Sequence, residues 1–286
     1  MTSVSYIGRI APTPTGDLHL GHAYTFYQAW KRAKDANGKL LLRIEDLDTG
    51  RCKPEYTQHT LEDLRWLGVD WDGEAEKQSD SPQRYLDVWR RLKEEGWIYP
   101  CTKTRKDLRT LPQPKKGDEQ DQEPLYPIEW RPDPSSAHAY DSPGDVTWRF
   151  RVSEGEVIRF SDVRKGEVSY TAGKEFGDFS LWRRDGIPSY ELSVVVDDIR
   201  QGITEVVRGE DLLKSTARQL LLYRALGATP PAWCHEPLVR DESGRRLAKR
   251  FHSLSIRTLR EQGHSAEEVL ERATTSIQSI KSNDSI

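Results

Sequence analysis

The segment Arg9–His22, RIAPTPTGDLHLGH, decides how the chain begins to fold. The apolar residues that precede it favour a short buried strand over residues 6–10, and residues 19–34 carry Leu20, Ala23 and further apolar side chains at helical spacing. A loop rich in proline joins the two. Strand, loop and helix in this order are typical of the first unit of a parallel α/β sheet.

Further along, the same pattern continues and is then interrupted. Lys39–Ile44, KLLLRI, is expected to form a second strand, a helix is expected over about 55–67, and Ser81 is the expected N-cap of the next helix. Residues 112–124 are polar, charged, glycine or proline and indicate a mobile loop, and alternating segments beyond them indicate antiparallel strands. The α/β pattern resumes near Leu192, so the sequence predicts a sheet domain that is split by an insertion.

Composition favours a globular protein of the cytoplasm. The chain has 286 residues, of which 35% are apolar and 31% charged, enough for a sizeable core spread over two or three lobes. No leader peptide and no run of ~18 apolar residues is recognisable, so neither secretion nor a membrane span is expected. The three cysteines are far apart and are expected to be reduced. A net charge of −3 means that a nucleic-acid partner would need a local basic surface.

Two histidines, His19 and His22, lie three residues apart where the first helix is expected to start. A helix N-terminus favours phosphate groups, and Gly21 in the first turn would let a nucleotide approach the backbone. Both imidazoles could donate hydrogen bonds to phosphate oxygens during nucleotidyl transfer. The pair is also compatible with two ordinary satisfied surface histidines, whereas a zinc site is disfavoured because no third ligand lies nearby.

A basic segment, RRLAKR at Arg245–Arg250, follows a turn-like DESG. Such a loop could close over a triphosphate, with Lys249 reaching the leaving phosphates. Seven of the 21 residues from Arg240 to Arg260 are Lys or Arg, enough for contacts to a phosphate backbone. The alternative is an ordinary solvated charged face.

Together these two motifs resemble the HIGH and KMSKS signatures of class I aminoacyl-tRNA synthetases. Three further segments, RIEDLD at 43–48, DGIPSYELSVVVDD at 185–198 and VVRGEDLL at 206–213, look like the glutamyl-tRNA synthetase family. The resemblance spans residues 9 to 250. It implies an α/β fold with a Rossmann-type parallel-sheet catalytic domain that activates L-glutamate. The glutamate carboxylate would attack the α-phosphate of ATP, with Mg²⁺ bound to the nucleotide, and pyrophosphate would leave.

The resemblance also implies a domain organisation. The catalytic domain is expected in two halves, 1–98 and 186–235, which are split by an inserted α+β acceptor-type lobe at 99–185. The KMSKS-like loop and a short helical, basic stem-contact extension are expected at 236–286. The family's large anticodon-binding domain has no expected counterpart, because only 36 residues follow Arg250.

Residue roles follow from the positions that match the family's motifs. A guanidinium is the natural partner of a carboxylate, and Glu45 matches the residue that holds the substrate ammonium. Leu20 and Ala23 are expected to pack rather than to act. The resemblance implies that glutamate is bound by Arg9, Ala11, Thr13, Glu45, Tyr190 and Arg208. It implies that ATP is bound by Pro12, His19, Gly21, His22, Arg246 and Lys249, and that His19, His22 and Lys249 act in catalysis.

The sequence departs from the family pattern at two places. In the basic loop, Arg246 and Ala248 replace a lysine and a serine, so hydroxyl hydrogen bonds are lost while Lys249 remains. The second departure concerns zinc.

The family branch that binds zinc has a Cys-x-Cys pair and then a Tyr-x-x-x-Cys, whereas Lys103 and Trp130 stand at two of these four positions. Only Cys101 and Tyr126 remain, which is too few for a closed structural site, and no zinc is expected. Trp97, Tyr99 and Trp130 are the candidates for apolar packing in its place.

The expected lack of an anticodon-binding domain indicates the branch of the family that attaches glutamate to the queuosine base of tRNA(Asp) instead of to a 3′ end. The segment RLAKRFHSLSIRTLREQG resembles that branch too. A monomer is expected. Two alternatives stay open, namely the catalytic fragment of an ordinary glutamyl-tRNA synthetase and a non-catalytic paralogue that only binds a nucleotide or RNA.

Overall fold

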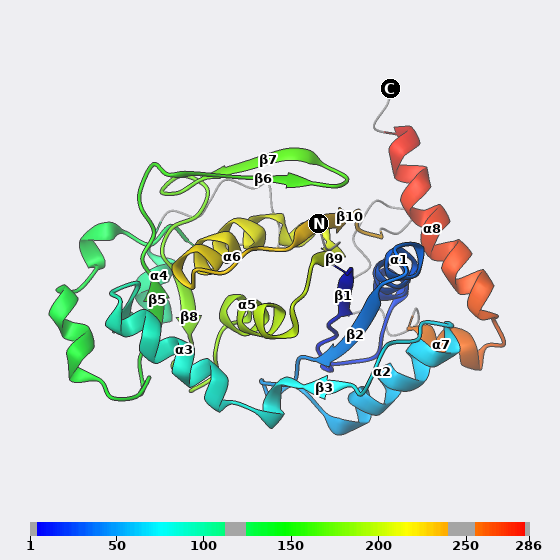
Figure 1. Ribbon diagram of the computed structural model, residues 1–286, viewed down its shortest axis with the longest axis horizontal. Coiled ribbons are helices and arrows are strands. Elements are labelled where there is room, and N and C mark those ends of the chain that lie inside the picture. Colours follow the sequence, from blue (N-terminus) through cyan, green and yellow to red (C-terminus); the bar gives the residue numbers. More distant parts are fainter. Residues whose placement is uncertain (1–4, 112–123, 240–254, 284–286) are drawn as a thin grey trace. The chain divides into compact units, whose positions relative to one another are not determined.

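The computed structural model describes residues 5–111, 124–239 and 255–283, and the chain folds into two compact units. The first unit comprises Met1–Asp80, Ile203–Glu210 and Pro231–Ile286, and the second comprises Ser81–Gly202 and Asp211–Pro230. Both units are therefore assembled from segments far apart in the sequence, as the colours of Figure 1 show. The four predicted domain ranges stay a prediction.

The first unit is built on short parallel strands. The β1–β2, β2–β3 and β9–β10 pairs are all parallel. The backbone N–H of Thr204 donates to the carbonyl of Ile7 at 2.8 Å, which places the start of β9 beside β1. The carboxyl ends of β1 and β2 therefore lie together, and this is where ligands bind in parallel α/β sheets. The strands are β1 (Ile7–Ile10), β2 (Lys39–Ile44), β3 (Glu76–Lys77), β9 (Glu205–Gly209) and β10 (Ala232–Glu236).

Helices cover these strands through small and branched side chains. Leu20 and Ala23 of α1 are 2% and 0% exposed and share a core with Leu40 and Leu42 of β2, so the prediction that they pack is confirmed. The last helix, α8, packs on α1 (Figure 1). The predicted strands and helices up to residue 67 are confirmed to within about one residue. The helices of this unit are α1 (Leu20–Asp35), α2 (Pro54–Trp66), α7 (Ile256–Glu261) and α8 (Ala266–Asn283).

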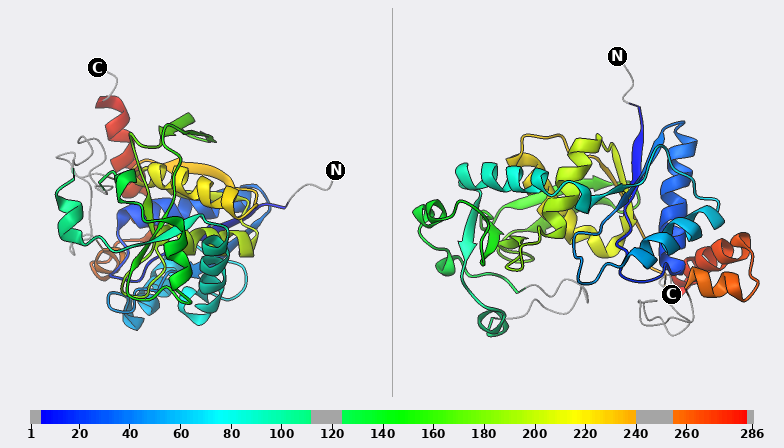
Figure 2. Two further views of the ribbon diagram at one scale, coloured as in Figure 1. Left: turned by 90° about the vertical axis from the view of Figure 1, so that its left-hand side faces the viewer. Right: turned by 90° about the horizontal axis from the view of Figure 1, so that it is seen from below.

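The second unit is α+β. Antiparallel strands β4, β5 and β8 form a sheet, β6 and β7 form a hairpin, and α5 and α6 lie side by side (Figures 1 and 2). Its strands are β4 (Ile98–Cys101), β5 (Thr147–Phe150), β6 (Val157–Asp162), β7 (Gly166–Thr171) and β8 (Phe179–Trp182). Its helices are α3 (Gln83–Glu94), α4 (Arg105–Arg109), α5 (Tyr190–Gln201) and α6 (Leu213–Ala225). Single 3₁₀ turns lie at Gln78–Asp80, Ile128–Trp130, Pro134–Ala139 and Glu210–Leu212.

Two local expectations differ from the structure. Ser81 does not cap α3, because the helix begins at Gln83 with Pro82 at the N-cap position and no side-chain cap. No strand was predicted over residues 232–236, which form the buried strand β10. The expected loop at 112–124 lies, but for Pro124, outside the described residues. In the part of the chain that is described, no helix combines the length and the hydropathy needed to cross a bilayer.

Candidate active site

The two histidines of the opening segment form the N-terminal cap of α1. The backbone N–H of Gly21 donates to Nδ1 of His19 at 3.1 Å, and the backbone N–H of His19 donates to Nδ1 of His22 at 3.2 Å. The two rings are stacked with centroids 3.8 Å apart. This is a reciprocal capping box in which imidazole nitrogens replace the usual hydroxyl and carboxylate.

The cap also determines where each neutral imidazole carries its proton. Since Nδ1 of His19 and of His22 each accept a backbone N–H, the ring proton is on Nε2 in both side chains. Each ring is therefore a donor at the nitrogen that points away from the backbone. These are the groups that a phosphate oxygen at a helix N-terminus would need.

The cap requires glycine at position 21 for a steric reason. A Cβ at this position would lie 3.0 Å from Cε1 and 3.1 Å from Nδ1 of His19, closer than side chains normally approach. Any larger residue would press on the capping ring. Contact between Gly21 and a nucleotide stays a prediction.

The predicted glutamate residues of the first unit converge at the ends of β1, β2 and β9. Arg9 is the third residue of β1, and its Nη1 donates to the carbonyl of Val207 in β9 at 3.3 Å. Glu45 directly follows β2, and its backbone N–H donates to the carbonyl of Pro12 at 2.9 Å. The loop that carries Ala11 and Thr13 is therefore held against the end of β2.

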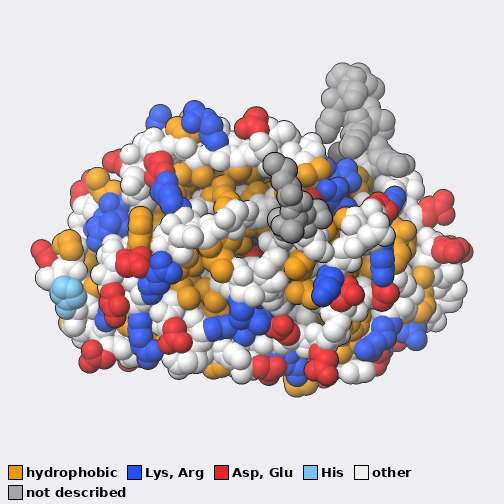
Figure 3. All heavy atoms as spheres, in the orientation of Figure 1, with side chains coloured by type: hydrophobic (Ala, Val, Ile, Leu, Met, Phe, Trp, Pro, Cys, Tyr) orange, Lys and Arg blue, Asp and Glu red, His pale blue; other side chains and the backbone are white. Residues whose placement is uncertain are grey.

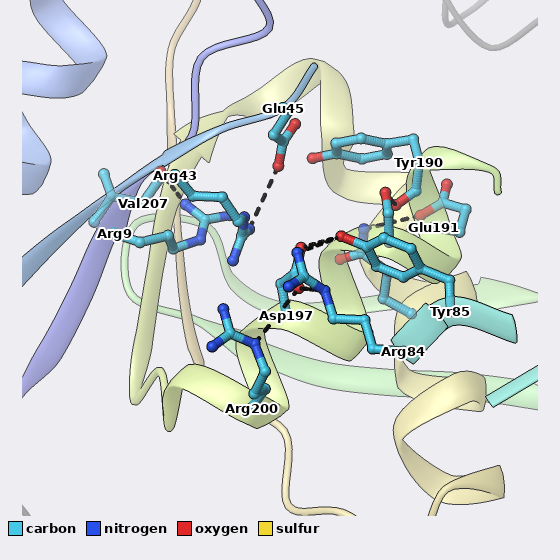
Figure 4. Close-up of polar contacts among 12 residues, drawn as sticks. Arg9, Arg43, Glu45, Arg84, Tyr85, Tyr190, Glu191, Asp197, Arg200 and Val207 are labelled. Atoms are coloured by element: carbon cyan, nitrogen blue, oxygen red, sulfur yellow. Dashed lines mark hydrogen bonds and ion pairs between the residues drawn. The ribbon is translucent and has the colours of Figure 1, made fainter. Parts of the chain in front are cut away.

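Arg43 is a site residue that the sequence reasoning missed. Its Nη2 lies 3.4 Å from Oε1 of Glu45, and the two side chains are 1% and 6% exposed (Figure 4). Arg9 is also buried, and Figure 4 shows its guanidinium beside that of Arg43. An arginine inside the apolar strand KLLLRI was the available signal, because a buried charge needs a partner.

Arg208, the fourth residue of β9, is held by side chains of the neighbouring strand. In the parallel register it lies opposite His235, whose Nε2 accepts from Nε of Arg208 at 3.2 Å. The ring of Trp233 lies 4.9 Å from the Arg208 guanidinium carbon. Arg208 is 5% exposed, so the described part of the first unit buries three guanidinium groups, those of Arg9, Arg43 and Arg208.

Tyr190 is the first residue of α5 in the second unit and is 37% exposed. Ser189 caps the helix by accepting from the N–H of Leu192 at 3.4 Å. The adjacent Glu191 is buried and accepts from Ser215 Oγ and Gln219 Nε2 of α6, both at 2.8 Å. The start of α5 is therefore fixed to α6, and Tyr190 projects from a rigid helix end (Figure 4). That Tyr190 binds glutamate together with the residues of the first unit stays a prediction.

Farther along α5, Asp197 is a fully buried carboxylate. The Tyr85 hydroxyl donates to it at 2.8 Å, and Nε of Arg84 lies 2.8 Å from its other oxygen (Figure 4). Burial raises the pKa of the Tyr85 phenol, and the charge of Asp197 raises it further, so the phenol stays protonated and donates. These bonds fix α3 against α5.

The four positions of the family's zinc site form an aromatic cluster. The Cys101 thiol and the Tyr126 hydroxyl lie 3.3 Å apart, and both residues pack with Tyr99 and Trp130 in a small buried core. Lys103 lies over the Trp130 ring, with Nζ 4.9 Å from its centroid, a cation–π contact. Among the described residues, no group of three or more His, Cys, Asp or Glu side chains could hold a metal ion.

Two predicted ATP-binding residues, Arg246 and Lys249, lie outside the described residues, as does most of the basic stretch. The described part of that stretch includes Arg257, which pairs with Glu62, and Arg260, which lies over the ring of Trp66. On the face shown in Figure 3, Lys and Arg side chains are interspersed with Asp and Glu.

Residues 7–282 match the model of the class I tRNA synthetase (E and Q) catalytic domain. The chain therefore belongs to this family and carries the catalytic domain of a ligase. More narrowly, it is 45% identical over 265 residues to the glutamyl-Q tRNA(Asp) synthetase of Nitratidesulfovibrio vulgaris, a match that covers 90% of this chain and 81% of that protein.

Two other relatives are longer proteins, of which the match covers only about half. A glutamate–tRNA ligase of Synechococcus sp. is 40% identical over 91% of this chain and 56% of its own length. The crystal structure of a glutamate tRNA ligase from Elizabethkingia meningosepticum in complex with its amino acid aligns with a TM-score of 0.72 at 28% identity, over 86% of this chain and 52% of that one. The expected fold class, a Rossmann-type α/β catalytic domain of class I, is confirmed.

Proposed function

We propose that the chain activates L-glutamate with ATP and transfers it to the queuosine base of tRNA(Asp), acting as a monomer in the cytoplasm. The observation that carries this proposal is the 45% identity, over most of both chains, to a relative named for that activity. The proposal has two chemical steps, and the described residues support the first.

The buried guanidinium groups suit a dicarboxylate amino acid. Arg9, Arg43 and Arg208 are each at most 5% exposed, so their positive charges are held in a buried setting, where a charged hydrogen bond is stronger than in water. Glu45, already paired with Arg43, supplies a carboxylate for the substrate ammonium. A ligand with two carboxylates and one ammonium complements this set, and arginine binds carboxylates in a bidentate manner.

In the first step, a glutamate carboxylate oxygen attacks the α-phosphorus of ATP, and pyrophosphate leaves. His19 and His22 donate from Nε2 to phosphate oxygens as negative charge develops on them, and Lys249 stabilises the departing pyrophosphate. Mg²⁺ is carried by the phosphates rather than by a protein cage, as is usual for this ion, and it neutralises charge on the triphosphate. No zinc is part of this proposal.

In the second step, a nucleophilic oxygen of the modified base attacks the acyl carbon of glutamyl-adenylate, and AMP leaves. An anticodon loop is single-stranded, so a base can be splayed out of it and enter a site directly. The described residues give no contact to RNA, so the acceptor rests on the similarity to relatives.

The first experiment measures pyrophosphate exchange with glutamate, ATP and Mg²⁺ but without tRNA. We expect exchange, and we expect Arg9→Ala or Arg208→Ala to cost about 2–4 kcal/mol in kcat/KM for glutamate, because a substrate carboxylate loses its charged partner. Exchange that strictly requires tRNA, or unaltered kinetics in both variants, would count against the proposal.

The second experiment measures transfer of labelled glutamate to tRNA(Asp) with and without queuosine, each with its 3′ end intact or oxidised by periodate beforehand. We expect transfer only to the queuosine-containing tRNA, and we expect it to survive oxidation of the 3′ end. Charging of unmodified tRNA(Glu) that periodate abolishes would favour an ordinary glutamyl-tRNA synthetase. Failure of all glutamate-dependent exchange would favour a non-catalytic paralogue.

A further inference from the structure

Strand β10 brings two aromatic side chains to Arg208 that no motif of the family resemblance includes. His235 is 0% exposed and Trp233 is 3% exposed. They are two residues apart, so they lie on the same face of the strand, and their rings are stacked with an interplanar angle of 18°. Because β9 and β10 run parallel with Arg208 opposite His235, both rings lie on the side of the sheet where the Arg208 side chain projects.

The two rings restrain the guanidinium in two different directions. The hydrogen bond from Nε of Arg208 to Nε2 of His235, at 3.2 Å, fixes the direction of the guanidinium within its plane. The Trp233 ring, 4.9 Å from the guanidinium carbon, supports its flat face. A bidentate contact with a carboxylate depends on both, because the two N–H bonds must be parallel and coplanar with the carboxylate.

The acceptor role of His235 also defines its tautomer. Nε2 accepts, so the ring proton is on Nδ1, and the imidazole is neutral. A buried neutral acceptor next to a buried arginine orients the cation without neutralising it. An Asp or Glu at the same place would pair with Arg208 and compete with a substrate carboxylate for it.

We infer that His235 and Trp233 are positioning residues that orient Arg208 for a carboxylate of the bound amino acid. This inference rests on the proposed function, because Arg208 is assigned to glutamate there. His235 and Trp233 touch Arg208 and act through it. Their effect is therefore on the Michaelis constant for glutamate rather than on that for ATP.

The test compares two substitutions of His235 in glutamate-dependent pyrophosphate exchange, with glutamate and ATP titrated separately. His235→Met keeps a side chain of similar length without a strong acceptor, whereas His235→Gln places an amide oxygen close to the position of Nε2. We expect His235→Met to raise the KM for glutamate by about ten- to one-hundredfold, the worth of a hydrogen bond to a charged group. We expect His235→Gln to restore it to within about threefold, and the KM for ATP to change by less than about twofold in both.

Matched variants separate positioning from folding. His138→Met changes an exposed histidine of the second unit and is expected to leave both constants unaltered. Trp233→Leu removes the supporting ring and is expected to raise the KM for glutamate. Trp233→Phe keeps an aromatic ring and is expected to raise this KM much less. Glutamate binding measured by calorimetry on the same proteins should follow the order of the KM values.

Each result decides between distinct outcomes. An unaltered KM for glutamate in both His235→Met and Trp233→Leu overturns the inference while the proposed function stands. If His235→Met and His235→Gln are impaired equally, and both Michaelis constants and the unfolding temperature change together, the role of His235 is structural. That result also overturns the inference. Absence of exchange in the unsubstituted protein refutes the proposed function first, and the inference falls with it.

Discussion

Asp63 of α2 is a buried carboxylate whose charge should destabilise the first unit at neutral pH. It is 0% exposed, and neither of its oxygens has a hydrogen-bond partner among the described residues. Burial raises the pKa of Asp63 from 3.8 to about 6, and the nearby Asp17 adds to the rise, although Arg257 and His59 oppose it. The folded protein therefore binds this proton more tightly than the unfolded chain.

The sign and size of the effect follow from this shift. Below about pH 4 the carboxyl is protonated in both states, and its contribution is present in full. As pH rises from about 4 through 6, the unfolded chain loses the proton first, so the free energy of unfolding decreases. A shift of about 2 pKa units corresponds to about 3 kcal/mol. Asp63→Asn removes the titration, so it should be more stable than the unsubstituted protein by up to about 3 kcal/mol at pH 7.5, with the difference shrinking toward pH 4.5.

Urea denaturation at pH 4.5, 6 and 7.5, followed by circular dichroism, tests the difference between the two proteins. Asp70→Asn is the control, because hydrogen bonds from Trp30 and Lys34 lower the pKa of that exposed carboxyl, so its removal should have the opposite sign of pH dependence. If Asp63→Asn is no more stable than the unsubstituted protein at pH 7.5, or if the difference is independent of pH, then Asp63 is not an unpaired buried charge.

Three further predictions concern the site and the lobe. His19→Asn keeps an N-cap but removes the Nε2 donor. The free energy of unfolding should therefore change by less than about 0.5 kcal/mol, while the rate of pyrophosphate exchange should fall about one-hundredfold. An undiminished rate would exclude His19 from the chemistry. Arg43→Met should lower stability by about 3–5 kcal/mol and raise the KM for glutamate, because Glu45 loses its buried partner; a stable variant with unaltered kinetics would contradict this. Trp130→Ala should destabilise the second unit by about 1–3 kcal/mol, whereas chelators should not shift the unfolding temperature; a chelator-sensitive transition would show that metal binds.

The elements of the opening segment were predictable because their patterns are local. A short apolar strand, a proline loop and a helix with Leu20 and Ala23 on one face need no information from elsewhere in the chain. The cap that His19 and His22 form was harder to predict. Their spacing was visible, but the use of Nδ1 on both rings depends on the backbone geometry of the first turn.

Residues that depend on strand pairing were missed. Strand β10 reads AWCHE, which lacks a clean alternation of apolar and polar residues, because His235 and Glu236 are both buried. Each residue of β10 pairs in parallel with the residue of β9 that lies 27 positions earlier in the sequence. Short-range sequence patterns do not predict such a pairing. Arg43 was missed for a related reason, since its importance comes from its distance to Glu45 and from its burial.

The imidazole cap of α1 adds no negative charge at the start of this helix. Aspartate is among the best N-caps, and an acidic residue commonly follows in the first turn, where it interacts favourably with the helix dipole. Here the capping atoms are neutral ring nitrogens, and the first turn of α1 contains no acidic residue. The helix is thus terminated without placing an anion where phosphates are proposed to bind, so an incoming nucleotide meets no electrostatic repulsion from the cap itself.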